Sequence, residues 1–285
     1  MVRKLAAADF RARRMVLEPT DFALTDGKPE PPPTDLVDRE VWHGIMDIAD
    51  DVVIRTTSYQ GSHVGVLYEL WGAWVNAMPE GCIVGYAMLE CSDDFAACMF
   101  SLLHGFYKQA VGTLRSALEI MIFACLCELT DDSRSWKEWE AGNEEIDFRL
   151  CRHRLRATIA MKLLEERAEG ATNRTLLADR NGADPGGWAT SLHRHLSNFI
   201  HARGTFSNGT MWMSNGPVYS AVGMRTAYQS YLETYALLLL LAKVAYPSLV
   251  IPDRADILFS YHSRRRYLRL PYRKLCGFVK RSVSP

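Results

Sequence analysis

Arg194 and His201 are the residues whose types and spacing point most directly to chemistry. They stand seven positions apart in the segment DPGGWATSLHRHLSNFIHARG. Asp184 and Pro185 open this segment with a helix start signal, because aspartate caps free backbone N–H groups and proline suits the first helical position. Gly204 is a favourable residue just beyond a helix end. On one helix, Arg194 and His201 share a face and lie about 10 Å apart along the axis.

At about 100° per residue, the same segment separates into an apolar face and a polar face. The apolar face comprises Trp188, Ala189, Leu192, Leu196, Phe199 and Ile200. The polar face comprises Ser191, Arg194, Ser197, Asn198 and His201. A helix that presents guanidinium, amide and imidazole groups from an anchored apolar back is a plausible active-site element. The alternative is an amphipathic helix with an ordinary exposed Arg and His.

The Arg194–His201 spacing, with His195 directly after the arginine, resembles the R-[N/H/D]-x(4–6)-H signature of HEPN domains. The segment HGFYKQAVGTLRSALEIMIFACLCE at 104–128 is similar to the "A…LRSxLE" helix of HEPN-like abortive-infection proteins. In those proteins an "LSxxxH" helix packs against it, and here 196–201 has the sequence LSNFIH. The resemblance covers residues 90–246 and implies an all-α bundle. The six-residue gap is at the upper limit of the signature, and the chain is longer than a minimal HEPN domain.

The resemblance also implies a reaction, cleavage of RNA by the 2′-OH of the substrate. His201 would transfer a proton, since an unperturbed imidazole titrates near pH 6.5. Arg194 would hold the scissile phosphate and offset charge in the transition state. Ser197 and Asn198 would position the sugar or the imidazole, and His195 would have a supporting role. HEPN nucleases pair two facing motifs, so a homodimer is expected, with no metal or other cofactor.

The longest helical pattern extends from Ser92 to about Thr130, and its polar side chains follow one stripe. The stripe comprises His104, Lys108, Arg115 and Glu119. In a functional interpretation it lines the cleft opposite the motif helix, where Arg115 and Glu119 orient the catalytic pair. Alternatively it is a solvated edge with an i,i+4 ion pair that contributes only ~0.3 kcal/mol.

Helical periodicity covers most of the remaining chain and predicts an all-α fold. We expect four parts: a basic arm and Pro-rich linker at 1–34, an N-terminal helical hairpin at 35–79, a HEPN-like bundle at 90–250 and a basic aromatic tail at 251–285. Within the bundle we expect an acidic connection at 131–147, a helix at about 144–168 and a last core helix at 224–246.

The tail concentrates positive charge in a chain whose net charge is zero. Residues 252–285 contain nine Lys or Arg and two Asp. The guanidinium group of arginine can donate two hydrogen bonds to a phosphate, and aromatic rings can stack on bases. This composition therefore indicates a single-stranded RNA contact. The residues expected to bind RNA are Arg264, Arg265, Arg266, Tyr267 and Arg269. A membrane-surface segment and a strap between two subunits are the alternatives.

Cysteine usage and missing motifs exclude several classes of protein. The seven cysteines form no CxxC pair and no zinc-ligand spacing, which is typical of reduced thiols in the cytoplasm. P-loop, Rossmann, Ser-triad and HExxH signatures are absent, which argues against common NTPases, dehydrogenases and hydrolases. The longest apolar run, 235–242, ends at Lys243 and is too short to span a membrane.

The resemblance therefore implies a HEPN-type endoribonuclease, as a prokaryotic toxin or anti-phage defence effector with an antitoxin or defence-system partner protein. Two other classes remain open. A catalytically silent HEPN-like bundle could bind nucleotide or protein as a sensor or partner subunit. A general helical adaptor would use neither Arg194 nor His201.

Overall fold

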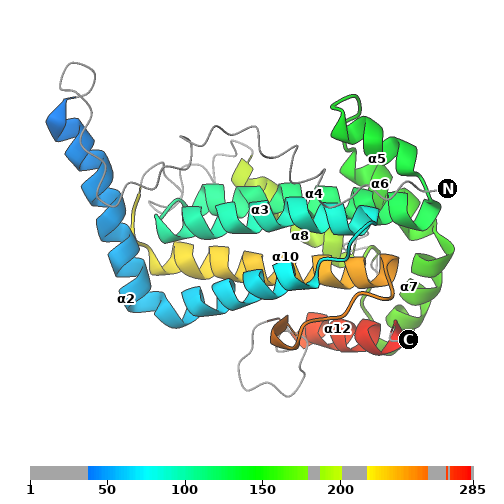
Figure 1. Ribbon diagram of the computed structural model, residues 1–285. Helices are drawn as coiled ribbons and strands as arrows, with labels where there is room; N and C mark the ends of the chain where they lie inside the picture. The colour runs from blue at the N-terminus through cyan, green and yellow to red at the C-terminus, as the bar shows by residue number, and fades with distance from the viewer. Residues whose placement is uncertain (1–37, 179–186, 201–216, 256–267, 269, 284–285) are drawn as a thin grey trace.

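The chain forms helices and no strands in the part that its structure describes. This computed structural model describes residues 38–178, 187–200, 217–255, 268 and 270–283. The helices are α2 (Arg39–Ala77), α3 (Ile83–Leu103), α4 (Tyr107–Thr130), α5 (Ser133–Glu140), α6 (Phe148–Ala157), α7 (Ile159–Thr172), α8 (Gly187–Ile200), α10 (Ala221–Ala245) and α12 (Leu270–Ser282). The predicted all-α class is confirmed (Figure 1).

Helices α3, α4 and α10 lie side by side along the centre of the molecule (Figure 1). The Glu128 carboxylate near the end of α4 accepts a hydrogen bond from the Val84 backbone N–H at the start of α3 (3.1 Å), so these helices are antiparallel. Gly223 at the start of α10 packs on the ring of Tyr107 at the start of α4, so α10 and α4 are parallel. The helix predicted at 224–246 is confirmed as α10, in which 231–245 is buried without interruption, but α12 follows it in the core.

The predicted helix from Ser92 to Thr130 is wrong as a single element, because the chain reverses between α3 and α4. Gly105 stands at this reversal with φ 79°, a left-handed conformation that favours glycine. A Cβ atom at Gly105 would also collide with the backbone of Val218. His104 consequently ends α3 and is separated from the α4 members of the predicted polar stripe. Its Nδ1 lies 2.8 Å from the Phe100 carbonyl oxygen.

The N-terminal hairpin predicted at 35–79 corresponds to α2, in which two helical arms meet at a kink at Gln60 (φ −128°, ψ 18°). The arm before Gln60 crosses the end of the bundle, whereas the arm after it runs along α3 (Figure 1). Trp71 and Trp74 anchor the second arm. Their indole N–H groups donate to backbone carbonyls of α3, at 3.1 Å and 2.7 Å.

The C-terminal half also differs from the predicted boundaries. The expected connection at 131–147 contains α5, and the expected helix at 144–168 divides at Thr158 into α6 and α7. Part of the expected RNA-binding tail is α12, which packs on α7 and α10 and buries Leu275, Cys276 and Val279. Arg273 is buried with them at 8% exposure, so its side chain is enclosed by the protein.

Two further findings concern the core. All seven cysteines are free thiols, and all except Cys82 are buried. Among the described residues, α4 is the one helix long and apolar enough to cross a membrane, but 72% of its most apolar window is buried inside the bundle. A core helix has the same properties, so α4 is weak evidence for a membrane span.

Candidate functional site

Helix α8 carries most of the predicted site, and its apolar face is fixed in the core. Trp188, Ala189, Leu192, Leu196 and Phe199 are buried as predicted. Ile200 is 46% exposed, so its assignment to the buried face is wrong. The well-packed face holds the helix at a fixed rotation about its axis, and this determines which side chains face outward.

The start of α8 is held by contacts from three neighbouring segments. The buried carboxylate of Glu165 on α7 accepts hydrogen bonds from three successive backbone N–H groups, the shortest from Leu176 at 2.7 Å. Leu176 in turn accepts a bond from the Ala189 N–H of α8 at 2.8 Å. The Trp188 ring stacks on the Tyr272 ring of α12, with centroids 4.4 Å apart and an interplanar angle of 6°. These contacts fix α8 against α7 and α12.

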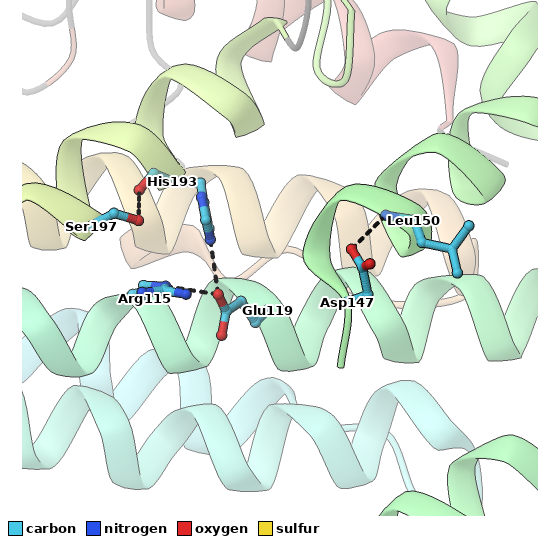
Figure 2. Close-up of polar contacts among 6 residues, drawn as sticks. All are labelled: Arg115, Glu119, Asp147, Leu150, His193 and Ser197. Carbon is cyan, nitrogen blue, oxygen red and sulfur yellow. Dashed lines mark hydrogen bonds and ion pairs between the residues drawn. The ribbon is translucent and has the colours of Figure 1, made fainter. Parts of the chain in front are cut away.

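A cluster of polar side chains joins α8 to α4 (Figure 2). Glu119 Oε1 accepts hydrogen bonds from Arg115 Nε at 2.7 Å and from His193 Nε2 at 2.8 Å. The Phe148 ring of α6 lies parallel to the imidazole of His193, with centroids 3.8 Å apart and an angle of 9°. We call these four residues the Glu119 cluster. It brings a cation, a carboxylate and an imidazole together on the surface of one helix pair.

Two hydrogen bonds fix the geometry of the cluster, one at the start of α6 and one to the backbone of α8 (Figure 2). Asp147 Oδ1 caps α6 by accepting from the Leu150 N–H at 2.9 Å, and Phe148 is the first residue of that helix. Ser197 Oγ donates to the His193 carbonyl oxygen at 2.7 Å. The predicted site residue Ser197 therefore supports the backbone beneath His193.

The cluster is partly buried and its carboxylate is ionised at neutral pH. The side chains of Arg115, Glu119 and His193 are 24%, 22% and 20% exposed. Burial alone raises the pKa of Glu119, but the hydrogen bonds from His193 and Arg115 outweigh burial and leave the pKa below its ordinary value. The predicted i,i+4 pair of Arg115 and Glu119 is confirmed.

The sequence interpretation missed His193. Helices α4 and α8 are antiparallel, with His193 opposite Glu119 and Ile200 opposite Gly112, where a Cβ atom would lie 3.5 Å from Ile200 Cγ1. Glu119 and Gly112 are seven residues apart on α4, and His193 and Ile200 are seven residues apart on α8. These two contacts define the register of the helices. A spacing of four residues puts His193 and Ser197 on one face of a helix, but only the register of α4 against α8 identifies Glu119 as the partner of His193.

The remaining α8 residues of the predicted site point in different directions. Arg194 is exposed, and Asn198 is half-buried. His195 Nε2 lies 3.0 Å from Ser230 Oγ of α10, and this hydroxyl donates its own proton to the Thr226 carbonyl oxygen. His195 therefore donates to Ser230 and connects α8 to α10, whereas His193 connects α8 to α4.

Several predicted site residues lie outside the described residues. They are His201 and the five tail residues Arg264, Arg265, Arg266, Tyr267 and Arg269. The structure thus brings together Arg115, Glu119 and Ser197 around His193, and Arg194 is the next residue after His193 on α8.

One cavity among the described residues lies apart from the Glu119 cluster. This cavity of about 260 Å³ is lined by Arg156, Lys162, Glu165, Glu166 and Thr175 among others, and none of the predicted site residues that the structure describes lines it. Within the described ranges, no group of three or more His, Cys, Asp or Glu side chains is placed to hold a metal ion. Comparison with protein-family models, with curated proteins and with solved structures finds no match to the chain.

Proposed function

We propose that the chain is a HEPN-type, metal-independent endoribonuclease in which Arg194 binds the scissile phosphate. One observation carries this proposal: Arg194 is exposed on a helix whose opposite face is buried. The direction of its side chain is therefore set by the core. The planar guanidinium donates two parallel hydrogen bonds to a phosphate, which suits an arginine on a rigid element to this task.

The proposed reaction is attack of the RNA 2′-OH on the adjacent phosphodiester. Arg194 offsets the charge that develops on the phosphate oxygens, and His201 transfers a proton at the reacting oxygens. The Arg-x6-His spacing supports this assignment of His201. The basic tail, through Arg264 to Arg266, Tyr267 and Arg269, supplies further contacts to the RNA strand.

The proposal includes the biological setting expected of such an enzyme. The chain acts in the cytoplasm as a homodimer with facing motifs, as a toxin or an anti-phage effector restrained by an antitoxin or partner protein. The reduced cysteines and the basic tail support the cytoplasmic and RNA-binding parts of this proposal.

One observation favours a catalytically silent sensor or partner subunit as the second candidate. Arg115 and His193 both bond to Glu119, so this carboxylate offsets the nearby positive charge without any ligand. A cluster of this kind stabilises the contact between two helices whether or not the protein is an enzyme.

The test compares RNA cleavage in excess EDTA by the wild-type protein, Arg194→Ala and His201→Ala. Arg134→Ala is the control, since Arg134 is an exposed helical arginine on α5. We expect losses of about 10²-fold or more for the first two variants and none for the control. Unfolding free energies should change by about 0.5 kcal/mol or less in all three. Equal activity in all variants, or no cleavage by the wild-type protein, would contradict the nuclease and leave the second candidate.

A further inference from the structure

His193 lies next to Arg194 on α8 and is held by three neighbouring groups. Its Nε2 contacts Glu119 of α4, its ring stacks on Phe148 of α6, and its carbonyl oxygen accepts from Ser197. An imidazole with so many contacts has a fixed ring plane and a fixed direction for each nitrogen. A fixed direction is what a proton-transferring group needs, because the transfer requires hydrogen-bond geometry.

The contact with Glu119 determines which nitrogen of His193 carries the proton. An ionised carboxylate has no proton to donate, so Nε2 must be the N–H donor in this pair. In the neutral imidazole the lone pair then lies on Nδ1. No hydrogen bond of Nδ1 is found to the described residues, and the His193 side chain retains 20% exposure.

We infer that His193, oriented by Glu119, is a catalytic base that takes the proton of the RNA 2′-OH while Arg194 holds the phosphate. This inference rests on the proposed nuclease function and adds a residue that the Arg-x6-His motif does not include. Glu119 acts as a positioning residue. Its negative charge also stabilises the imidazolium that forms when Nδ1 accepts the proton.

The charges that face His193 suit this role. Glu119 and Arg115 face it from α4, Phe148 of α6 contributes an uncharged ring, and Arg194 follows it on α8. Arg115 also bonds to Glu119 and keeps it ionised, so the carboxylate remains an acceptor for Nε2. Arg115 thus acts through Glu119 and not on the substrate.

The step balances without any further reagent. The 2′-OH proton moves to Nδ1 of His193, the O2′–P bond forms and the P–O5′ bond breaks. The leaving 5′ oxygen takes a proton from water. The products are a 2′,3′-cyclic phosphate and a 5′-hydroxyl.

The experiment measures RNA cleavage against pH in EDTA for the wild-type protein, His193→Gln and Glu119→Gln. Glutamine in place of His193 retains an N–H for Glu119 but cannot accept a proton. We expect His193→Gln to lower kcat about 10²-fold or more with little change in KM. Glu119→Gln should also lower kcat with little change in KM, because the neutral amide no longer determines which nitrogen of His193 carries the proton.

His153→Gln is the matched control, since His153 is an exposed histidine on α6. Its cleavage rate and its pH profile should be those of the wild-type protein. Long-range proton–nitrogen NMR of the folded wild-type protein gives a second readout that does not depend on any variant. Near pH 8 it should show the Nε2–H tautomer of His193, and an Nδ1–H tautomer would overturn the inference.

The outcomes separate the inference from the function on which it rests. Cleavage by the wild-type protein with an unchanged rate for His193→Gln overturns the inference and leaves the nuclease standing. Altered melting of Glu119→Gln with unchanged kcat and KM shows a purely structural cluster and also overturns it. Absence of cleavage by the wild-type protein overturns both proposals.

Discussion

A single carboxylate oxygen, Glu119 Oε1, receives hydrogen bonds from two side chains on different helices. The bond from Arg115 lies within α4, and the bond from His193 reaches α8. Because about a fifth of each side chain is exposed, solvent weakens these interactions, and the cluster contributes only ~1 kcal/mol to folding. Its value lies in geometry, since it fixes the orientation of one imidazole.

Asp94 on α3 gives a pH-dependent prediction. Its Oδ2 is buried without a hydrogen-bond partner. Burial raises its pKa to about 7, although a hydrogen bond with Ser116 opposes the shift. The pKa is raised above its unfolded value of about 3.9, so the stabilisation is complete below that pH and is lost as the pH rises towards 7. Asp94→Asn should therefore stabilise the protein more at pH 8 than at pH 4.5, by roughly 3 kcal/mol.

Urea unfolding at the two pH values measures this difference. The control is Asp50→Asn, which removes one carboxylate from an exposed position of α2. An equal gain for Asp94→Asn at both pH values would show that the burial of this carboxyl is compensated.

At the scale of elements, the fold depends on sharp reversals between long helices. Gly105 separates α3 from α4, and Gly142 follows α5; both have positive φ, at 79° and 77°. The two glycines differ in their surroundings. Backbone atoms of Val218 surround the position of a Cβ at Gly105, whereas nothing lies within 4 Å of one at Gly142.

This difference predicts unequal costs for the same substitution. Gly142→Ala should cost about 1 kcal/mol, which is the strain of a left-handed non-glycine residue. Gly105→Ala should cost about 2 kcal/mol more, because the segment near Val218 must also move. Chemical unfolding of the two variants gives both values. Similar losses for both would mean that the contact with Val218 relaxes at little cost.

Periodicity predicted the helices that have a clear apolar face. It did not predict features that depend on how the helices pack against one another. The buried residues Trp188 to Phe199 of α8 and the extent of α10 followed from spacing alone. The reversal at Gly105 did not, because apolar residues continue on both sides of it. His193 was missed because its partner depends on the register of α4 against α8, which neither segment reveals separately.

At the scale of the molecule, the basic C-terminal tail separates into two parts. Residues 270–282 form α12, whose apolar side is part of the core. A deletion that removes α12 would damage the fold and cannot test RNA binding. The cluster Arg264 to Arg266 lies outside the described residues and is tested by substitution.

Replacing Arg264, Arg265 and Arg266 together by alanine should weaken binding of single-stranded RNA. If all three contact phosphates, the slope of log affinity against log salt should fall by about 2, since each phosphate contact on a single strand contributes about 0.7. Fluorescence anisotropy at several salt concentrations measures both quantities. A triple variant of the exposed Arg134, Arg149 and Arg174 removes the same charge and should leave the slope unchanged. An equal loss in both variants would indicate a general charge effect.

The reactivity of the six buried cysteines reports which helices have separated from the bundle. Burial raises the pKa of every one of these thiols, so the thiolate that reacts with oxidants and alkylating agents is scarce while the helices are closed. They are distributed over α3, α4, α6 and α12. Each thiol becomes reactive only when its own helix separates from the bundle. Covalent labels would therefore accumulate on these thiols in the order in which the helices detach. Oxidants would modify few of the six thiols while the protein stays folded.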